Sequence, residues 1–255
     1  MLDRLLHDFW FENVNNFNIQ NAANQCEESE MIEYIRQFQN GNFQSKKEFL
    51  NYFLYSTDRR VFVVGMRLFM AIADHTDFGL LEEFLSICDE EQLRVFLAFV
   101  EESLSLHSIP YLLALCEEWE DTYVENDIVR CILGMLGQEY YQEEKYDIEQ
   151  IGESFVEFAG KHDLNKYYYN GEEYFSGNLT KLIIPIAMDC HHKNKVFYFD
   201  QISSILSNSS GIECPVSDGV TVDDSKVKEL YDYVFSISKM EQQKGEKYFY
   251  GFKVS

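Results

Sequence analysis

Three hexapeptides of the chain each begin with arginine and continue with mainly apolar residues: Arg60-Val61-Phe62-Val63-Val64-Gly65, Arg94-Val95-Phe96-Leu97-Ala98-Phe99 and Arg130-Cys131-Ile132-Leu133-Gly134-Met135. Their first residues are 34 and then 36 positions apart. Each hexapeptide lies in a helical pattern that is followed by a polar turn and a second amphipathic helical pattern. A helix pair of this length cannot bury its own apolar face, so neighbouring pairs must stack. The repeat therefore favours an α-solenoid, and an irregular bundle of ordinary helices is the alternative.

The rest of the sequence also indicates a mainly α fold. Only three prolines occur, and apolar residues recur at helical spacing through most of the chain. The spacing predicts helices over residues 27–38, 46–55, 58–75, 78–88, 89–106, 110–119, 123–136, 148–159, 179–191, 195–207 and 225–242. Residues 208–218 are expected to form a loop, and the alternating aromatics of 247–254 predict a short strand or an extended arm.

Two regions are expected along the chain. Residues 1–160 are predicted to form an irregular, HEAT-like helical array. Residues 161–255 are predicted to form a helical C-terminal extension with a possible short strand, packed on the same domain. The change falls where the helical series gives way to an aromatic, turn-rich connection.

The charge of the chain limits its partners. Forty-four acidic residues against 21 lysines and arginines give a formal net charge of −23. Such a field repels nucleic acids and anionic membranes and attracts basic proteins. No basic patch offsets it, because the densest basic stretch, 181–195, is interrupted by apolar and acidic residues. We therefore expect neither a nucleic acid nor a membrane as partner.

The sequence also predicts a cytoplasmic protein. No stretch approaches the roughly 18–20 apolar residues that cross a bilayer. Residues 1–8 carry acids where a signal peptide would carry bases. The six cysteines lack a short repeated spacing and are expected to be free thiols.

Motifs for catalysis and metal binding are absent from the sequence. It contains no glycine-rich phosphate loop, no GxSxG motif and no HExxH motif. Asp189, Cys190, His191 and His192 are adjacent on one predicted helix, where neighbouring side chains point in different directions and do not converge on one ion. The other histidines stand near predicted helix ends, where the helix dipole explains them. We expect no metal, no cofactor and no enzymatic activity.

Acidic residues instead gather on predicted helix ends and turns. The expected partner-binding residues are Glu82, Glu83, Glu90, Glu91, Glu117, Glu118, Trp119, Glu120, Asp121, Tyr123 and Glu125. In a stacked array, equivalent positions line up along one side and form an acidic ridge. Aromatic residues beside exposed charges are typical of interface hot spots. The alternative is a solvated face with Trp119 in the core. A second acidic stretch, 139–144, is expected to extend the same surface.

At this point the sequence resembles the helical immunity proteins of bacterial polymorphic-toxin and contact-dependent inhibition systems, and in particular the immunity protein 47 family. The resemblance rests on Phe78-Gly79-Leu80-Leu81-Glu82-Glu83-Phe84-Leu85 and on the acidic helical pairs through Leu136. It implies a cytosolic antidote that binds one cognate toxin domain and blocks its active site or substrate contacts. Many such toxins are nucleases, and a basic surface of that kind would be attracted by an acidic antidote.

Two other functions stay open from the sequence. A general α-solenoid scaffold or adaptor would bind several partners in a concave groove. An enzyme of the HEAT-like DNA glycosylase kind would need a basic track for DNA, and the net charge of −23 argues against it.

Overall fold

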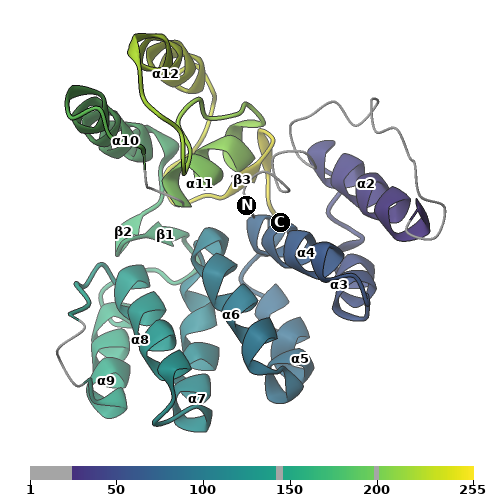
Figure 1. Ribbon diagram of the computed structural model, residues 1–255. Helices are drawn as coiled ribbons and strands as arrows, with labels where there is room; N and C mark the ends of the chain where they lie inside the picture. The colour runs from purple at the N-terminus through teal and green to yellow at the C-terminus, as the bar shows by residue number, and fades with distance from the viewer. Residues whose placement is uncertain (1–24, 142–145, 198–200) are drawn as a thin grey trace. The chain divides into compact units, whose positions relative to one another are not determined.

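The computed structural model describes residues 25–141, 146–197 and 201–255 (Figure 1). Its α-helices are α2 (Gln25–Gln39), α3 (Lys46–Leu54), α4 (Arg59–Ile72), α5 (Glu82–Ile87), α6 (Glu90–Phe99), α7 (Ile109–Glu118), α8 (Tyr123–Met135), α9 (Ile148–Ala159), α10 (Ser176–His192), α11 (Gln201–Ser210) and α12 (Asp224–Ile237). The 3₁₀ helices are η2 (Asp77–Leu81), η3 (Val100–Ser103) and η4 (Leu106–Ser108). The mainly α fold predicted from the sequence is confirmed, and it is compatible with a helical solenoid or bundle.

Two short antiparallel hairpins complete the described elements: β1 (Tyr168–Tyr169) with β2 (Glu172–Glu173), and β3 (Tyr248–Phe249) with β4 (Phe252–Lys253). Each has a two-residue turn with two positive φ angles, 48° and 72° at Asn170 and Gly171 and 51° and 81° at Tyr250 and Gly251. Turns of this kind match the twist of the paired strands. The small β element predicted near the C-terminus is therefore present as β3–β4.

The contacts divide the chain into two compact units. Within the described residues, unit 1 combines the chain up to Ile72 with Phe175–Gln243 and Tyr248–Ser255, and unit 2 combines Ala73–Tyr174 with Lys244–Lys247. This grouping differs from the ranges 1–160 and 161–255 expected from the sequence. Those ranges stay a prediction about folding domains.

In unit 1, α4 is the most buried helix. All its residues from Val61 to Ile72 are buried except Arg67, because its apolar residues surround the helix and other elements must cover every side. It packs against α2, α3 and β3. At the crossing with α3, Gly65 lies directly against the Phe53 ring: a Cβ added there would overlap Phe53 Cβ and Cγ and lie 2.8 Å from Cδ1.

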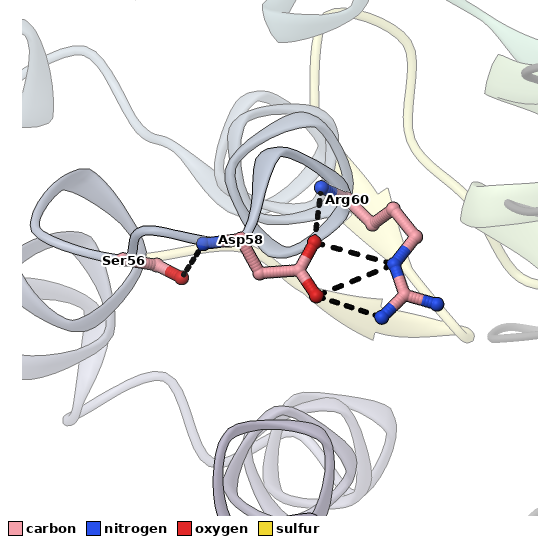
Figure 2. Close-up of polar contacts among 3 residues, drawn as sticks. All are labelled: Ser56, Asp58 and Arg60. Atoms are coloured by element: carbon pink, nitrogen blue, oxygen red, sulfur yellow. Dashed lines mark hydrogen bonds and ion pairs between the residues drawn. The ribbon is translucent and has the colours of Figure 1, made fainter. Parts of the chain in front are cut away.

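Asp58 caps the N-terminus of α4 (Figure 2). Its Oδ1 accepts a hydrogen bond from the backbone N–H of Arg60 at 2.8 Å, and its Oδ2 lies 2.7 Å from Arg60 Nη2. Ser56 Oγ accepts from the Asp58 N–H at 3.1 Å. The side-chain hydrogen bond from Arg60 is the largest cause that holds the pKa of Asp58 below its usual range. The first arginine of the repeated pattern is thus used in a helix cap.

Replacing Asp58 by alanine should lower the free energy of unfolding by about 1 kcal/mol near neutral pH, because the first turn of α4 loses its acceptor. A lowered carboxyl pKa contributes stability above the unfolded-state pKa and loses it as the pH falls through the folded-state pKa. The difference between Asp58→Ala and the parent should therefore shrink below about pH 4. Urea unfolding at several pH values measures this difference in the free energy of unfolding. A difference that is constant from neutral to acid pH would contradict the ionised cap.

The helix α11 extends further than expected. The sequence predicts a loop from residue 208, but α11 continues through Ser210, and Ile202–Ser210 are all buried. The hydroxyls of Ser207 and Ser210 donate to Ser203 O at 2.6 Å and Leu206 O at 2.7 Å. Serine usually favours turns because its hydroxyl competes with the helix for backbone hydrogen bonds. In α11 the hydroxyls of Ser207 and Ser210 instead donate to carbonyls of their own helix, so these buried polar groups keep a hydrogen-bond partner.

Unit 2 contains the helical series α5–α9. Helix α7 packs against α8 and α9, and α6 packs against α8. The expected single helix over 89–106 is wrong: α6 ends at Phe99, the chain tightens into η3, and Leu104 has a left-handed φ of 59°. A buried hydroxyl explains part of the break, because Ser103 Oγ accepts from the Ser105 N–H at 3.3 Å in place of helical bonding. The first part of the expected helix over 78–88 is likewise the 3₁₀ helix η2.

Candidate partner-binding surface

Helices α6 and α8 of unit 2 run parallel. Three contacts join residues that follow one another in the same order on both segments. Arg94 Nη1 lies 3.7 Å from Asp127 Oδ2, and Cys131 Sγ lies 3.5 Å from Leu97 O. A Cβ at Gly134 would lie 3.7 Å from Oε1 of Glu101, just after α6. Parallel alternate helices are the arrangement that a stacked helical repeat produces. The N-termini of α6 and α8 therefore lie at the same end of unit 2.

The arginines of the last two hexapeptides form ion pairs on these two helices. Arg94 Nε lies 3.0 Å from Glu90 Oε1 on its own helix, and Arg94 also reaches Asp127 on α8. Arg130 Nη2 lies 3.1 Å from Asp127 Oδ1 on the same helix. Both arginines are thus engaged by carboxylates, and Arg94 links the two helices. Since these pairs are largely exposed to solvent, they contribute little stability.

Acids of the two turns at this end of unit 2 lie close to one another. We name this end the acidic turn surface; it consists of the α5–α6 turn with Glu90 and Glu91, and the α7–α8 turn with Glu117, Glu118, Trp119, Glu120, Asp121, Tyr123 and Glu125. Burial and the nearby Glu118 carboxylate raise the pKa of Cys88, between α5 and α6, to about 11. Because Glu118 ends α7, its influence on the pKa of Cys88 indicates that the two turns lie near each other.

Most of these acids are fully available to solvent. Glu90, Glu91, Glu117, Glu118, Glu120 and Asp121 are all exposed. Within the described residues, Glu117, Glu118, Glu120 and Asp121 have no ion-pair partner. Glu117 and Glu118 also lie at the C-terminal end of α7, where the helix dipole disfavours negative charge. Local structure therefore gives these two carboxylates no stabilising role.

Glu125 and Trp119 have roles inside the α7–α8 turn. Asp121 adopts a left-handed φ of 61°, and its N–H donates to Glu125 Oε2 at 2.9 Å. Trp119 is half-buried, and its carbonyl accepts from Thr122 Oγ1 at 2.7 Å. Both residues shape the turn, and their expected part in partner binding stays a prediction.

Glu82 and Glu83 lie apart from this cluster. They are exposed in the first turn of α5, and the acidic turn surface begins at the other end of that helix. Negative charge in the first turn suits the helix dipole, so these two acids have a structural explanation within α5. Their expected role in binding also stays a prediction.

Two large apolar side chains protrude from the acidic turn surface. Tyr123, the first residue of α8, is 86% exposed, and Ile87, the last residue of α5, is 76% exposed. The sequence singled out Tyr123 but not Ile87. Phe84 is buried on α5, and a residue three positions later is expected on the same face of a helix. The helical spacing therefore gives no sign that Ile87 is exposed.

The second acidic stretch is only partly described, because residues 142–145 lie outside the described residues. Glu139 and Tyr141 are exposed, and the rings of Tyr140 and Tyr146 are stacked with centroids 5.3 Å apart. Whether this stretch extends the acidic turn surface stays a prediction.

A buried polar cluster lies elsewhere in unit 2. His75 and His107, expected to stand alone at helix ends, have ring centroids 4.9 Å apart, and Tyr167 stacks on His75 at 4.2 Å. His75 Nδ1 is 2.8 Å from Ser105 Oγ. Burial first, and then His107, hold the pKa of His75 below its usual range. Ser105 is completely buried and the two histidines are half-buried, so packing within unit 2 accounts for this serine–histidine contact.

The remaining histidine cluster has a local explanation. His191 Nε2 is 3.0 Å from Asp224 Oδ1, which joins the end of α10 to the start of α12 in unit 1. In the described part of the chain, no three histidine, cysteine or acidic side chains are placed to hold a metal ion. Cys88, Cys116, Cys131, Cys190 and Cys214 are free thiols. Among the described residues, no helix has the length and the hydropathy needed to span a membrane.

The fold and this surface define a helical protein that presents acidic and apolar side chains at the turns between its helices. The family model for Immunity protein 47 matches residues 14–254, and the chain belongs to this family. The resemblance inferred from the sequence is confirmed. Neither the comparison with curated proteins nor the comparison with solved structures finds a match.

Proposed function

We propose that this immunity protein neutralises a cognate toxin domain by binding it through the acidic turn surface, and that the bound face of the toxin is basic, as in a nuclease. Membership of the immunity protein 47 family supports an immunity function. The observation that carries the choice of surface is the group of exposed carboxylates without ion-pair partners among the described residues, Glu117, Glu118, Glu120 and Asp121.

Charge complementarity would act mainly on the rate of association. A partner with a basic face is attracted over about a Debye length, roughly 8 Å at physiological salt, and the net charge of −23 adds to this attraction. Such steering raises association rate constants to as much as about 10⁸ M⁻¹s⁻¹ at low salt. Rapid capture fits the task of an antidote, since the toxin acts as soon as it is free.

The partner itself is identified first. The tagged chain is used to capture proteins from its host at low and high salt, and each captured domain is then expressed with and without the chain. One basic domain that is toxic alone and harmless with the chain supports the proposal. Many weak partners without toxicity would instead favour the general scaffold.

Charge reversal then tests the surface. Glu117→Lys with Glu118→Lys should lower the association rate constant for the toxin about tenfold at low salt and flatten its salt dependence. Lysine is favourable at the end of α7, so the fold is retained. The matched control is Glu153→Lys with Glu172→Lys, two exposed acids of α9 and β2 in the same unit. Stopped-flow kinetics measure both. An equal decrease in the two variants would mean that only net charge matters and would contradict a specific acidic surface.

A further inference from the structure

Ile87 and Tyr123 lie at the same distance in sequence from an arginine of the repeated pattern. Each lies seven residues before the arginine of its repeated hexapeptide, Arg94 for Ile87 and Arg130 for Tyr123. In the structure Ile87 ends α5, just before α6, and Tyr123 is the first residue of α8. One exposed apolar side chain therefore lies at or just before the start of each helix of the parallel pair α6 and α8.

The exposure of these two side chains is not explained by the fold of unit 2. Neighbouring apolar residues are directed inward: Leu85 and Phe84 beside Ile87, and Val124 beside Tyr123, are all buried. Within the described residues, the Tyr123 side chain has no ring or hydrogen-bond partner and is the most exposed large apolar side chain. Protruding apolar residues bordered by charge mark protein interaction sites more often than isolated ones do.

The parallel packing of α6 and α8 places the two residues at the same end of unit 2. The contacts from Arg94–Asp127 to Leu97–Cys131 keep the two helices in parallel register. Ile87 lies three residues before α6 begins at Glu90, and Tyr123 is the first residue of α8. They are bordered by Glu90 and Glu91 on one turn and by Glu118, Glu120 and Asp121 on the other.

We infer that Ile87 and Tyr123 are paired anchors that bind one basic protein face carrying two apolar depressions. The charge around the anchors commits this inference to a partner with lysine or arginine at the rims of both depressions. An arginine or lysine there can also lie over the ring of Tyr123. The inference rests on the proposed function and names which side chains hold the toxin once it has been captured.

Anchors and acids should have different kinetic effects. Long-range charge changes the association rate, whereas truncation of a well-packed anchor changes mainly the dissociation rate. Ile87→Ala and Tyr123→Ala should each raise the dissociation rate constant of the toxin complex about tenfold or more, with the association rate constant within about twofold of the parent. Surface-immobilised toxin domain and stopped-flow mixing measure the two constants.

Matched controls are available in the same chain. Val156 on α9 is 69% exposed and Tyr55 after α3 is 77% exposed, so Val156→Ala and Tyr55→Ala remove similar apolar surface elsewhere. Both should leave the dissociation rate unchanged. Tyr123→Phe should retain most of the affinity, because the ring supplies the contact. All of these residues are exposed, and circular dichroism should show an unchanged fold.

The outcomes separate the two proposals. A parent chain that neither binds nor neutralises any toxin overturns the proposed function. A parent chain that does both, while the anchor variants dissociate no faster than the controls, overturns only the anchor inference. Sedimentation velocity tests a second copy as the occupant: a parent dimer that Ile87→Ala or Tyr123→Ala converts to monomer also overturns it.

Discussion

Replacing Gly65 by alanine is expected to lower the free energy of unfolding by about 2 kcal/mol, although alanine is the better helix former by about 1 kcal/mol. The added Cβ would overlap Phe53 Cβ and Cγ. Phe53 is completely buried and Gly65 lies on the most buried helix of unit 1, so neither can move aside without displacing other core side chains. Overpacking of this kind costs about 1–3 kcal/mol or more, which outweighs the gain in helix propensity.

The control for Gly65 is Gly152→Ala on α9. A Cβ added at Gly152 has no atom within 4 Å, so the propensity gain acts alone and should stabilise the protein by about 0.5–1 kcal/mol. Urea unfolding followed by circular dichroism measures both variants. Stabilisation by Gly65→Ala would mean that α3 and α4 are not packed as closely as described.

The second large effect is expected at Lys247. This lysine is only 2% exposed, its Nζ donates to Ala73 O at 2.9 Å, and it lies 5.8 Å from the centre of the Tyr167 ring. Its segment is held in unit 2 by hydrogen bonds from Tyr167 N to Gly245 O at 3.0 Å and from Gly245 N to Tyr174 O at 2.7 Å. One buried side chain thus joins the last segment of unit 2 to its first residue.

Lys247→Ala should lower the free energy of unfolding by about 3 kcal/mol. It removes a charged hydrogen bond, worth about 1.5–3 kcal/mol, together with the packed aliphatic stem. Lys247→Met keeps the stem and should recover part of the loss. Lys244→Ala, at an exposed position three residues earlier, should change stability by less than about 0.5 kcal/mol. Equal effects at the two lysines would contradict the buried contact.

An independent measurement follows the histidine beside Lys247. The Lys247 charge is one of the causes that lower the pKa of His75, after burial and His107. Lys247→Met should therefore move the pKa of His75 upward, toward its ordinary value near 6.5. Titration by nuclear magnetic resonance records this shift in the folded protein. An unchanged pKa of His75 would mean that the Lys247 charge does not act on the His75 cluster, even if the variant were destabilised.

Much of the local structure was predictable because it depends on neighbours in sequence. The limits of α9 were predicted as observed, and those of α3, α7 and α8 to within one residue. In these helices the apolar spacing, the acidic first turns and the proline at the start of α7 all favour the same register. The predictions failed in segments where buried hydroxyl groups compete with or support helical hydrogen bonds, at Ser103–Ser105 and at Ser207–Ser210.

The candidate surface was predictable only in part. Charged residues at helix ends stay exposed because burial of an unpaired charge is costly, whatever the packing of the helices. The acids from Glu117 to Asp121 could therefore be identified from the sequence. Ile87 was missed because its exposure depends on which elements cover α5, not on its own helical register. His75 and His107 were judged separate because 31 residues intervene between them, whereas the ring contact depends on tertiary packing.

The sequence by itself determined the helical fold class and the acidic character, since composition and periodicity are properties of the chain alone. Its resemblance to the immunity protein 47 family rested on particular residues, and the family model confirms it. The tertiary structure decided that α6 and α8 are parallel and that the acids of two turns come together. It also decided that Lys247 closes unit 2 onto Ala73 across 174 positions. The physical reason is that such contacts join segments far apart in sequence, and the apolar pattern of one helix does not specify which other helix will cover it.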